Sequence, residues 1–171
     1  MQQRKHKVRD EDSRTRQAIL AAARTLFAER GFEGTSTQAI VKLSQTSKGS
    51  FYYFFASKED LYAAVLEGMM EHMWDTSFGG MNIEMVDRDS FWMHIAGAWQ
   101  HSVSYMLEHP EEMRLWRGFQ ETWRAISDAG PARRLRAKNL QMGERLAALG
   151  QQLGCVRRDL SPAQCAELVE A

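Results

Sequence analysis

A run of five aromatic residues, Phe51 to Phe55, is the part of the sequence whose residue types point most directly to a binding function. It lies within SKGSFYYFFASKEDL, residues 47–61. On a helix, Phe51, Phe54 and Phe55 fall at i, i+3 and i+4 and therefore share one face, which suits a small core. The opposite face carries a cation, a glycine, a hydroxyl and two phenols: Lys48, Gly49, Ser50, Tyr52 and Tyr53. That second face suits contact with a polyanion.

Two residues of this stretch suit phosphate in particular. Gly49 costs a helix about 1 kcal/mol relative to alanine, which is reasonable if another backbone must approach it closely. Lys58 lies in the first turn of the next predicted helix, where a cation beside free N–H groups makes a phosphate site. For Tyr52 and Tyr53 the competing interpretation is packing in the core. The interpretation as a binding face is favoured because both lie opposite the phenylalanines.

The sequence carries none of the residue sets that catalysis requires. There is no Ser/Cys–His–Asp set and no glycine-rich phosphate loop, so no enzyme, catalytic residue or cofactor is predicted. His94 and His101 share a helix face but lack further ligands, so no metal site is predicted. Cys155 and Cys165 have no companion at metal spacing and are expected to be free thiols in a reducing cytoplasm. No apolar run approaches about 18 residues, so no membrane partner is expected.

The formal net charge of zero conceals three blocks. Residues 1–58 carry 11 Lys/Arg and 5 Asp/Glu, residues 59–130 carry 4 and 13, and residues 131–171 carry 7 and 4. A basic first third in a neutral chain indicates a polyanion-binding module joined to something else. A solvated basic face is the simpler alternative, and charge alone does not decide between them.

Apolar residues at helical spacing predict helices along nearly the whole of the 171-residue chain and no β-strand. The first helix is expected to begin at a Ser13 cap, and the second at a capping box of Thr35 and Gln38. A third helix is expected over about 47–54, and a long fourth one capped by Ser57 with Asp60. A loop is expected over 75–90. Further helices are predicted over 90–108, 110–127, 131–149 and from 162 onward. The predicted fold class is all-α.

The stretch FEGTSTQAIVKLSQTSKGSFYYFFASKEDLYAAVL resembles the signature of the TetR family of transcriptional regulators. The similarity is dense from about residue 13 to 73 and is only architectural beyond 75. The resemblance implies a basic N-terminal arm over 1–12 and a DNA-binding domain over 13–73, with its helix-turn-helix at about 36–55. It also implies a helical effector-binding and dimerisation domain over 74–171, truncated at its C-terminus.

The resemblance also implies roles for single residues. The DNA-contacting set is Thr37, Gln38, Ser47, Lys48, Gly49, Ser50, Tyr52, Tyr53 and Lys58. For Gln38 and Ser50, ordinary solvated polar residues are an equally good interpretation. The chain departs from the family pattern at Ser44 and Gln45 in the turn, at Val41, where the family prefers alanine, and at Phe51. If the turn keeps a positive φ, Gln45 carries a cost of about 1–2 kcal/mol that glycine would avoid.

Residues 59–130 hold all five tryptophans and eight of the ten methionines. In the family, a small-molecule pocket lies between such helices, and pockets of this kind are mostly apolar. The candidate ligand-binding residues are Trp92, His94, Trp99, His101, Tyr105, Met106, Trp116, Phe119 and Trp123. The alternative is an ordinary core, since aromatic stripes at helical spacing usually pack inside the protein.

We therefore predict a ligand-responsive regulator, a repressor that binds a double-stranded DNA operator as a homodimer and is released by an apolar or aromatic small molecule. The expected location is the bacterial cytoplasm, at the nucleoid. A helical protein-interaction adaptor is the alternative; it would explain the acidic, Trp-rich half but not the basic aromatic stretch. The family dimerises through two long C-terminal helices, whereas residues 161–171 begin only one. Truncation is favoured over a dimer formed by other surfaces.

Overall fold

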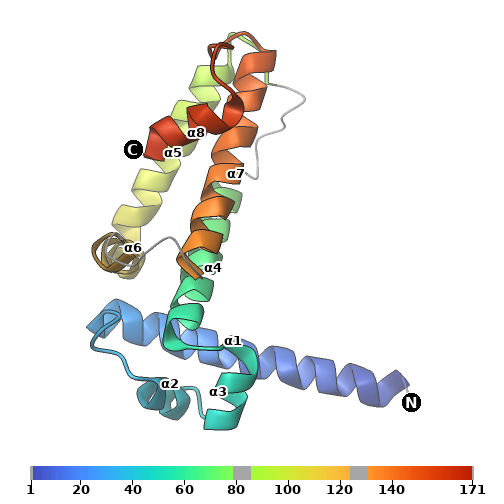
Figure 1. Ribbon diagram of the computed structural model, residues 1–171, viewed down its shortest axis with the longest axis vertical. Coiled ribbons are helices and arrows are strands. Elements are labelled where there is room, and N and C mark those ends of the chain that lie inside the picture. Colours follow the sequence, from blue (N-terminus) through green and yellow to red (C-terminus); the bar gives the residue numbers. More distant parts are fainter. Residues whose placement is uncertain (1, 79–85, 124–130, 171) are drawn as a thin grey trace. The chain divides into compact units, whose positions relative to one another are not determined.

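The protein is described here by a computed structural model covering residues 2–78, 86–123 and 131–170, with side chains for 11–78, 86–119 and 133–168. The described residues form helices and no strand, which confirms the all-α prediction (Figure 1). The helices are α1 (Gln2–Arg30), α2 (Thr37–Leu43), α3 (Lys48–Phe54), α4 (Lys58–Phe78), α5 (Phe91–Glu108), α6 (Pro110–Trp123), α7 (Pro131–Gln152) and α8 (Pro162–Glu170). No helix in these ranges is long and apolar enough to cross a membrane.

Three of the predicted ends of the first four helices differ from the structure, and α7 ends at Gln152 where residue 149 was predicted. Helix α1 begins at Gln2 and not at Ser13, because the charged and amide residues before Ser13 are good helix formers with no Gly or Pro among them. Helix α4 continues to Phe78, so residues 75–78, which were expected to be loop, are helical; residues 79–85 of that expected loop lie outside the described residues. The rings of Trp74 and Phe78, one turn apart, stack with centroids 4.4 Å apart and support this last turn.

The start of α2 is the third difference, because the capping box predicted at Thr35 is absent. Ser36 is the N-cap, and its hydroxyl accepts a hydrogen bond from the N–H of Ala39 at 3.2 Å. Thr35 is buried, and its hydroxyl lies 3.1 Å from the carbonyl of Leu26 and 2.8 Å from that of Gly31. A residue with its hydroxyl committed to the preceding helix is not available to cap the next one.

The chain divides into two compact units. The first contains residues 1–69 and 109–127, and the second contains residues 70–108 and 128–171. In the first unit, α1 packs against α2, α3 and α6. The ring of Tyr62 lies 4.8 Å from Phe27 and 5.1 Å from Phe32, centroid to centroid, and forms the aromatic centre of the core. Other fully buried side chains in this unit are Ile19, Ile40, Phe51, Leu61, Leu66 and Leu115.

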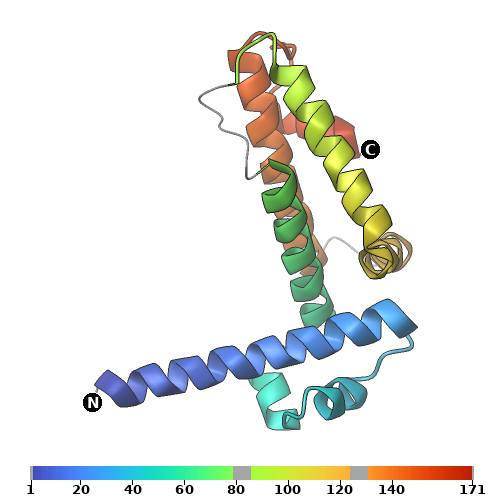
Figure 2. The ribbon, with the colours of Figure 1, turned by 180° about the vertical axis from the view of Figure 1, so that it is seen from behind.

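In the second unit, α7 and α8 lie side by side (Figure 2). Glycines allow the close approach of neighbouring segments here. A Cβ added at Gly143 would lie 3.0 Å from the Cβ of Ala166, and one added at Gly150 would lie 2.4 Å from a methyl of Val156. Helix α7 ends at Gln152, and Gly154 follows with φ of +73°, the left-handed conformation common after a helix C-terminus.

Gln45, in the turn between α2 and α3, has φ of +53°. Among the residues that the structure describes, it is the one non-glycine residue with a positive φ. This confirms the conformation on which the predicted strain at Gln45 depended. We expect Gln45→Gly to raise the free energy of unfolding by about 0.5–1 kcal/mol, because glycine has no Cβ to clash in this region. Urea denaturation followed by circular dichroism measures the change. Gln45→Ala keeps the Cβ and is the control; an equal gain from alanine would contradict the strain argument.

Candidate nucleic-acid interface

Two capped helices and a tight turn build the frame of the site. Ser36 caps α2 and Ser47 caps α3, where the Ser47 hydroxyl accepts from the N–H of Ser50 at 2.9 Å. In the turn, the hydroxyls of Ser44 and Thr46 lie 2.8 Å apart. These local bonds satisfy the polar groups that helix ends leave unpaired, so α2 and α3 hold a defined angle.

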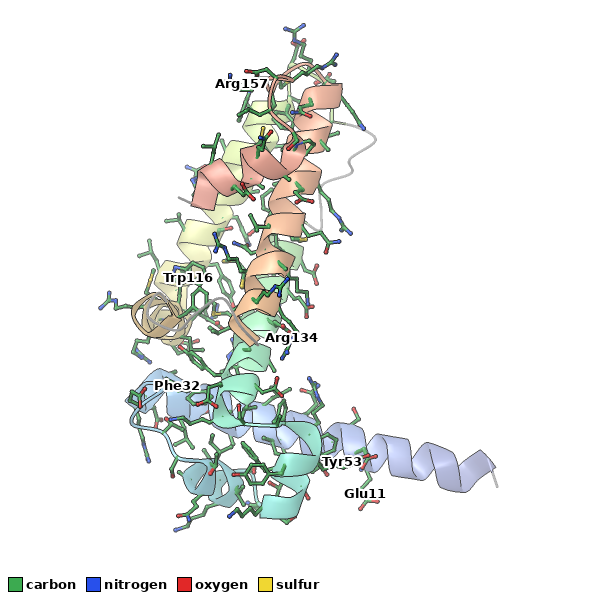
Figure 3. The ribbon with its side chains drawn as sticks, in the orientation of Figure 1. Glu11, Phe32, Tyr53, Trp116, Arg134 and Arg157 are labelled. Atoms are coloured by element: carbon green, nitrogen blue, oxygen red, sulfur yellow. The ribbon has the colours of Figure 1, made fainter. Side chains whose placement is uncertain are left out.

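The two faces of α3 divide as predicted. Phe51 and Phe55 are buried and Phe54 is half-buried, so this face packs on the core. Tyr52 is 50% exposed and Tyr53 is 72% exposed (Tyr53 is labelled in Figure 3). The alternative that placed both tyrosines in the core is therefore wrong. Two phenols are held in solvent on a short, well-anchored helix.

Residues from both helices meet in a small open groove. It is lined by Thr37, Gln38, Val41, Lys48, Phe51 and Tyr52. Within it, the Lys48 ammonium lies 6.0 Å from the centroid of the Tyr52 ring, at the outer limit of a cation–π contact. The structure thus brings four predicted site residues together from two helices. It adds Val41, which is half-buried and was not among the predicted site residues.

Four more of the predicted residues lie on α3 or at its N-cap. Ser47, Gly49 and Tyr53 are exposed, and Ser50 is half-buried with its hydroxyl 2.9 Å from that of Ser47. A Cβ added at Gly49 would meet only the Ser47 oxygen, at 3.6 Å, which is ordinary contact. The fold itself therefore does not require glycine at position 49.

Lys58 is held within the protein. Its ammonium donates a hydrogen bond to the carbonyl of Phe32 at 2.9 Å and lies 4.0 Å from the centroid of the Phe32 ring. The first turn of α4 also carries Glu59, whose pKa is lowered, chiefly by a hydrogen bond from the Ser57 hydroxyl and then by its own backbone N–H. An ionised carboxylate thus already occupies this helix start. Phosphate binding by Lys58 stays a prediction, and Lys58 makes an internal contact that the sequence did not indicate.

The candidate ligand-binding residues fall in both compact units. On α5, Trp92, His94, Trp99 and His101 are exposed, with Trp92 and Trp99 at 57% and 71%. Tyr105 and Met106 are half-buried, and the Tyr105 ring meets His72 edge-on at 5.6 Å. In the first unit, Trp116 and Phe119 on α6 are half-buried with rings 5.4 Å apart. The side chain of Trp123 lies outside the described residues. The pocket assignment stays a prediction.

Metal chemistry finds no support in the part of the chain with described side chains, where no group of three or more His, Cys, Asp or Glu residues could hold an ion. Cys155 and Cys165 are free thiols, both half-buried.

Comparison with known proteins gives a family match over a range that includes α2 and α3. Residues 19–65 match the family described as "Bacterial regulatory proteins, tetR family". The chain is 36% identical over 77 residues to the HTH-type transcriptional regulator QacR of Staphylococcus aureus, covering 44% of this chain and 40% of that protein. It is 32% identical over 113 residues to the HTH-type transcriptional repressor NicS of Pseudomonas putida, covering 65% of this chain and 51% of that protein. These names describe regulators and not enzymes.

The fold is also that of solved regulators. The fatty acid degradation regulator FadR from Bacillus halodurans aligns with a TM-score of 0.67 at 17% identity, covering 91% of this chain and 77% of that one. At this identity the likeness concerns the fold alone. The chain spans about half or less of the length of QacR and NicS. The family match covers residues 19–65, which include α2 and α3.

Proposed function

The chain belongs, through its N-terminal domain, to the TetR family of bacterial regulatory proteins, and on this premise we propose that it is a ligand-responsive DNA-binding transcriptional regulator. It acts as a repressor, bound to a near-palindromic operator and released by a small, largely apolar effector. The observation that carries the proposal is the outer face of α3, where Lys48, Tyr52 and Tyr53 are exposed. Lys48 and Tyr52 line one groove with Gln38 of α2.

This face suits the DNA major groove for three physical reasons. An α-helix fits the width of the groove, and its first turns reach base edges. Lys48 supplies a cation at the N-terminal end of α3, and Tyr53 a phenol that can donate to a base or contact a thymine methyl. Thr37, Gln38, Ser47, Ser50 and Tyr52 surround them with further hydrogen-bonding groups for phosphates and bases. Lys58 adds a phosphate contact only if it leaves the carbonyl of Phe32.

The domain organisation of the proposal follows the family. Residues 13–73 bind DNA, and the basic residues of 1–12 add sequence-independent attraction to phosphates, which makes affinity strongly salt-dependent. Residues 74–171 bind the effector and contribute to a homodimer, which presents two α3 helices to two half-sites. The protein works in the bacterial cytoplasm at the nucleoid.

The effector is proposed to be apolar or aromatic. All five tryptophans lie within residues 59–130, and Trp92 and Trp99 on α5 are exposed and available to a flat ligand. The name of NicS, a repressor, supports the direction of regulation. The effector releases DNA only to the extent that it binds the DNA-incompetent conformation more tightly than the DNA-binding conformation.

Selection of duplexes from a random pool tests the function directly. We expect an enriched, near-palindromic sequence whose affinity exceeds that of random duplex by about 10³-fold or more at physiological salt. A screen of apolar small molecules should then find one that quenches tryptophan fluorescence and releases this duplex. No enrichment of any sequence would favour the alternative, a protein-interaction adaptor. Ligands that bind without changing DNA affinity would argue for a constitutive regulator.

A further inference from the structure

Three backbone carbonyls at the C-terminal end of α1 are bonded by groups from three different places. The carbonyl of Phe27 accepts from the N–H of Gly31 at 3.0 Å, and that of Leu26 accepts from the hydroxyl of Thr35 at 3.1 Å. The carbonyl of Ala28 accepts from Nε of Arg114 at 2.9 Å, across 86 residues of sequence. A cation at a helix C-terminus is favoured by the helix dipole. Arg114, on α6, thus supplies a hydrogen-bond donor and a positive charge to the C-terminal end of α1.

A buried ion pair joins the same two helices. Glu112 on α6 is fully buried and forms an ion pair with Arg24 on α1, whose side chain is 42% exposed. Thr35 and Glu112 are the two polar side chains that are fully buried in the described part of the chain. A buried polar group costs free energy unless it is bonded. Both side chains therefore restrict the positions that the neighbouring backbone can take.

A third bond ties α6 to α4, since the Tyr62 hydroxyl donates to the carbonyl of Leu115 at 3.2 Å. Little room is left between these helices, because a Cβ added at Gly118 would lie 3.1 Å from the same hydroxyl. Helix α6 therefore contacts α1 and α4 through polar bonds at three positions within one helical turn: Glu112, Arg114 and Leu115. It belongs structurally to the unit that contains α2 and α3.

The end of α1 sets where α2 begins. Thr35 bonds both to Leu26 and to the carbonyl of Gly31, and the next residue, Ser36, is the N-cap of α2. A shift of the last turn of α1 must therefore be passed to the cap of α2 and so to the groove that α2 shares with α3. Only four residues separate Gly31 from Ser36, and the last of them, Thr35, is bonded to α1 at Leu26.

From this geometry we propose that Arg114 is a positioning residue for DNA binding. It acts from α6 by holding the C-terminal turn of α1, and with it the junction that places α2. Glu112 supports the same contact through Arg24. The proposal rests on the proposed function for its effect on DNA affinity, but its effect on the α1–α2 junction is independent of DNA.

The test compares Arg114→Gln with Arg117→Gln, which removes the same charge from an exposed position on the same helix. At a temperature where circular dichroism shows both variants fully folded, Arg114→Gln is expected to bind the selected operator about five- to tenfold more weakly than Arg117→Gln. The salt dependence of the two variants should be equal, because neither arginine touches phosphate in this proposal. Arg114→Lys keeps a cation at the end of α1 and should recover most of the affinity.

Amide hydrogen exchange without DNA gives the second readout. Exchange at Gly31, Thr35 and Ala39, whose N–H groups bond at this junction, should be faster in Arg114→Gln than in Arg117→Gln. Equal exchange and equal operator affinity in the two variants would overturn the proposal. A lower salt dependence in Arg114→Gln alone would show a direct phosphate contact and would also overturn it. If no duplex binds even the wild type, the proposed function fails, and exchange alone decides whether Arg114 holds the junction.

Discussion

Replacing Lys48 or Tyr53 by alanine is expected to weaken binding to the selected operator by about 1–3 kcal/mol each, or about five- to 150-fold. Both side chains are exposed on the outer face of α3, and neither supports the core. The loss therefore comes from contacts with DNA and not from unfolding. Fluorescence anisotropy with a labelled duplex measures the affinity, and thermal denaturation shows that stability is unchanged.

Matched controls separate specific contacts from general attraction. Arg145→Ala removes a positive charge from an exposed position on α7, far along the chain from α3, and should leave operator affinity nearly unchanged. Binding to random duplex should fall much less than binding to the operator in both Lys48→Ala and Tyr53→Ala, because base contacts carry the specificity. Wild-type operator affinity in both variants would show that α3 is not the recognition helix.

Gly49→Ala is expected to have opposite effects on the fold and on DNA binding. The added Cβ meets only the Ser47 oxygen at 3.6 Å, and alanine is the better helix former, so stability should stay equal or rise by up to about 1 kcal/mol. On DNA, the same methyl group would enter the space that the duplex backbone needs. Operator affinity should therefore fall by about 1–3 kcal/mol, the usual cost of an extra methyl group in a packed contact.

The two effects are measured on one protein sample, by urea denaturation and by operator binding. Gly68→Ala provides the control, since Gly68 is an exposed glycine within α4 with open space around its Cα. That variant should gain stability without losing DNA affinity. Operator affinity that survived Gly49→Ala would mean that DNA does not approach this backbone, and the helix dipole and side chains of α3 alone would have to hold the duplex.

The local structure of the site could be read from the sequence because local rules produce it. The i, i+3, i+4 spacing of Phe51, Phe54 and Phe55 determines which face of α3 is apolar, and the tyrosines follow on the other face. Ser57 and Asp60 cap α4, with the Ser57 hydroxyl accepting from the N–H of Asp60 at 3.2 Å. Each of these features depends on residues within about one helical turn, so periodicity and capping chemistry were sufficient.

Where the sequence misled, two local rules competed. Thr35 and Ser36 can both cap a helix, and the sequence pattern chose Thr35 because Gln38 stands three residues later. In the structure Ser36 is the N-cap, because the Thr35 hydroxyl is hydrogen-bonded to the carbonyls of Leu26 and Gly31. Lys58 likewise has the charge and the position of a phosphate ligand. In the structure, however, its ammonium contacts the carbonyl and the ring of Phe32.

By itself, the sequence determined the helices of the first compact unit, the two faces of α3 and the family. Only the tertiary structure showed that α6 belongs to that unit, through Glu112 with Arg24 and through Arg114 with the carbonyl of Ala28. A glutamate and an arginine near the start of an amphipathic helix look like solvated surface residues in any one-dimensional pattern. Their roles depend on a partner helix more than 80 residues earlier in the chain, and such contacts form only when packing brings the two helices together.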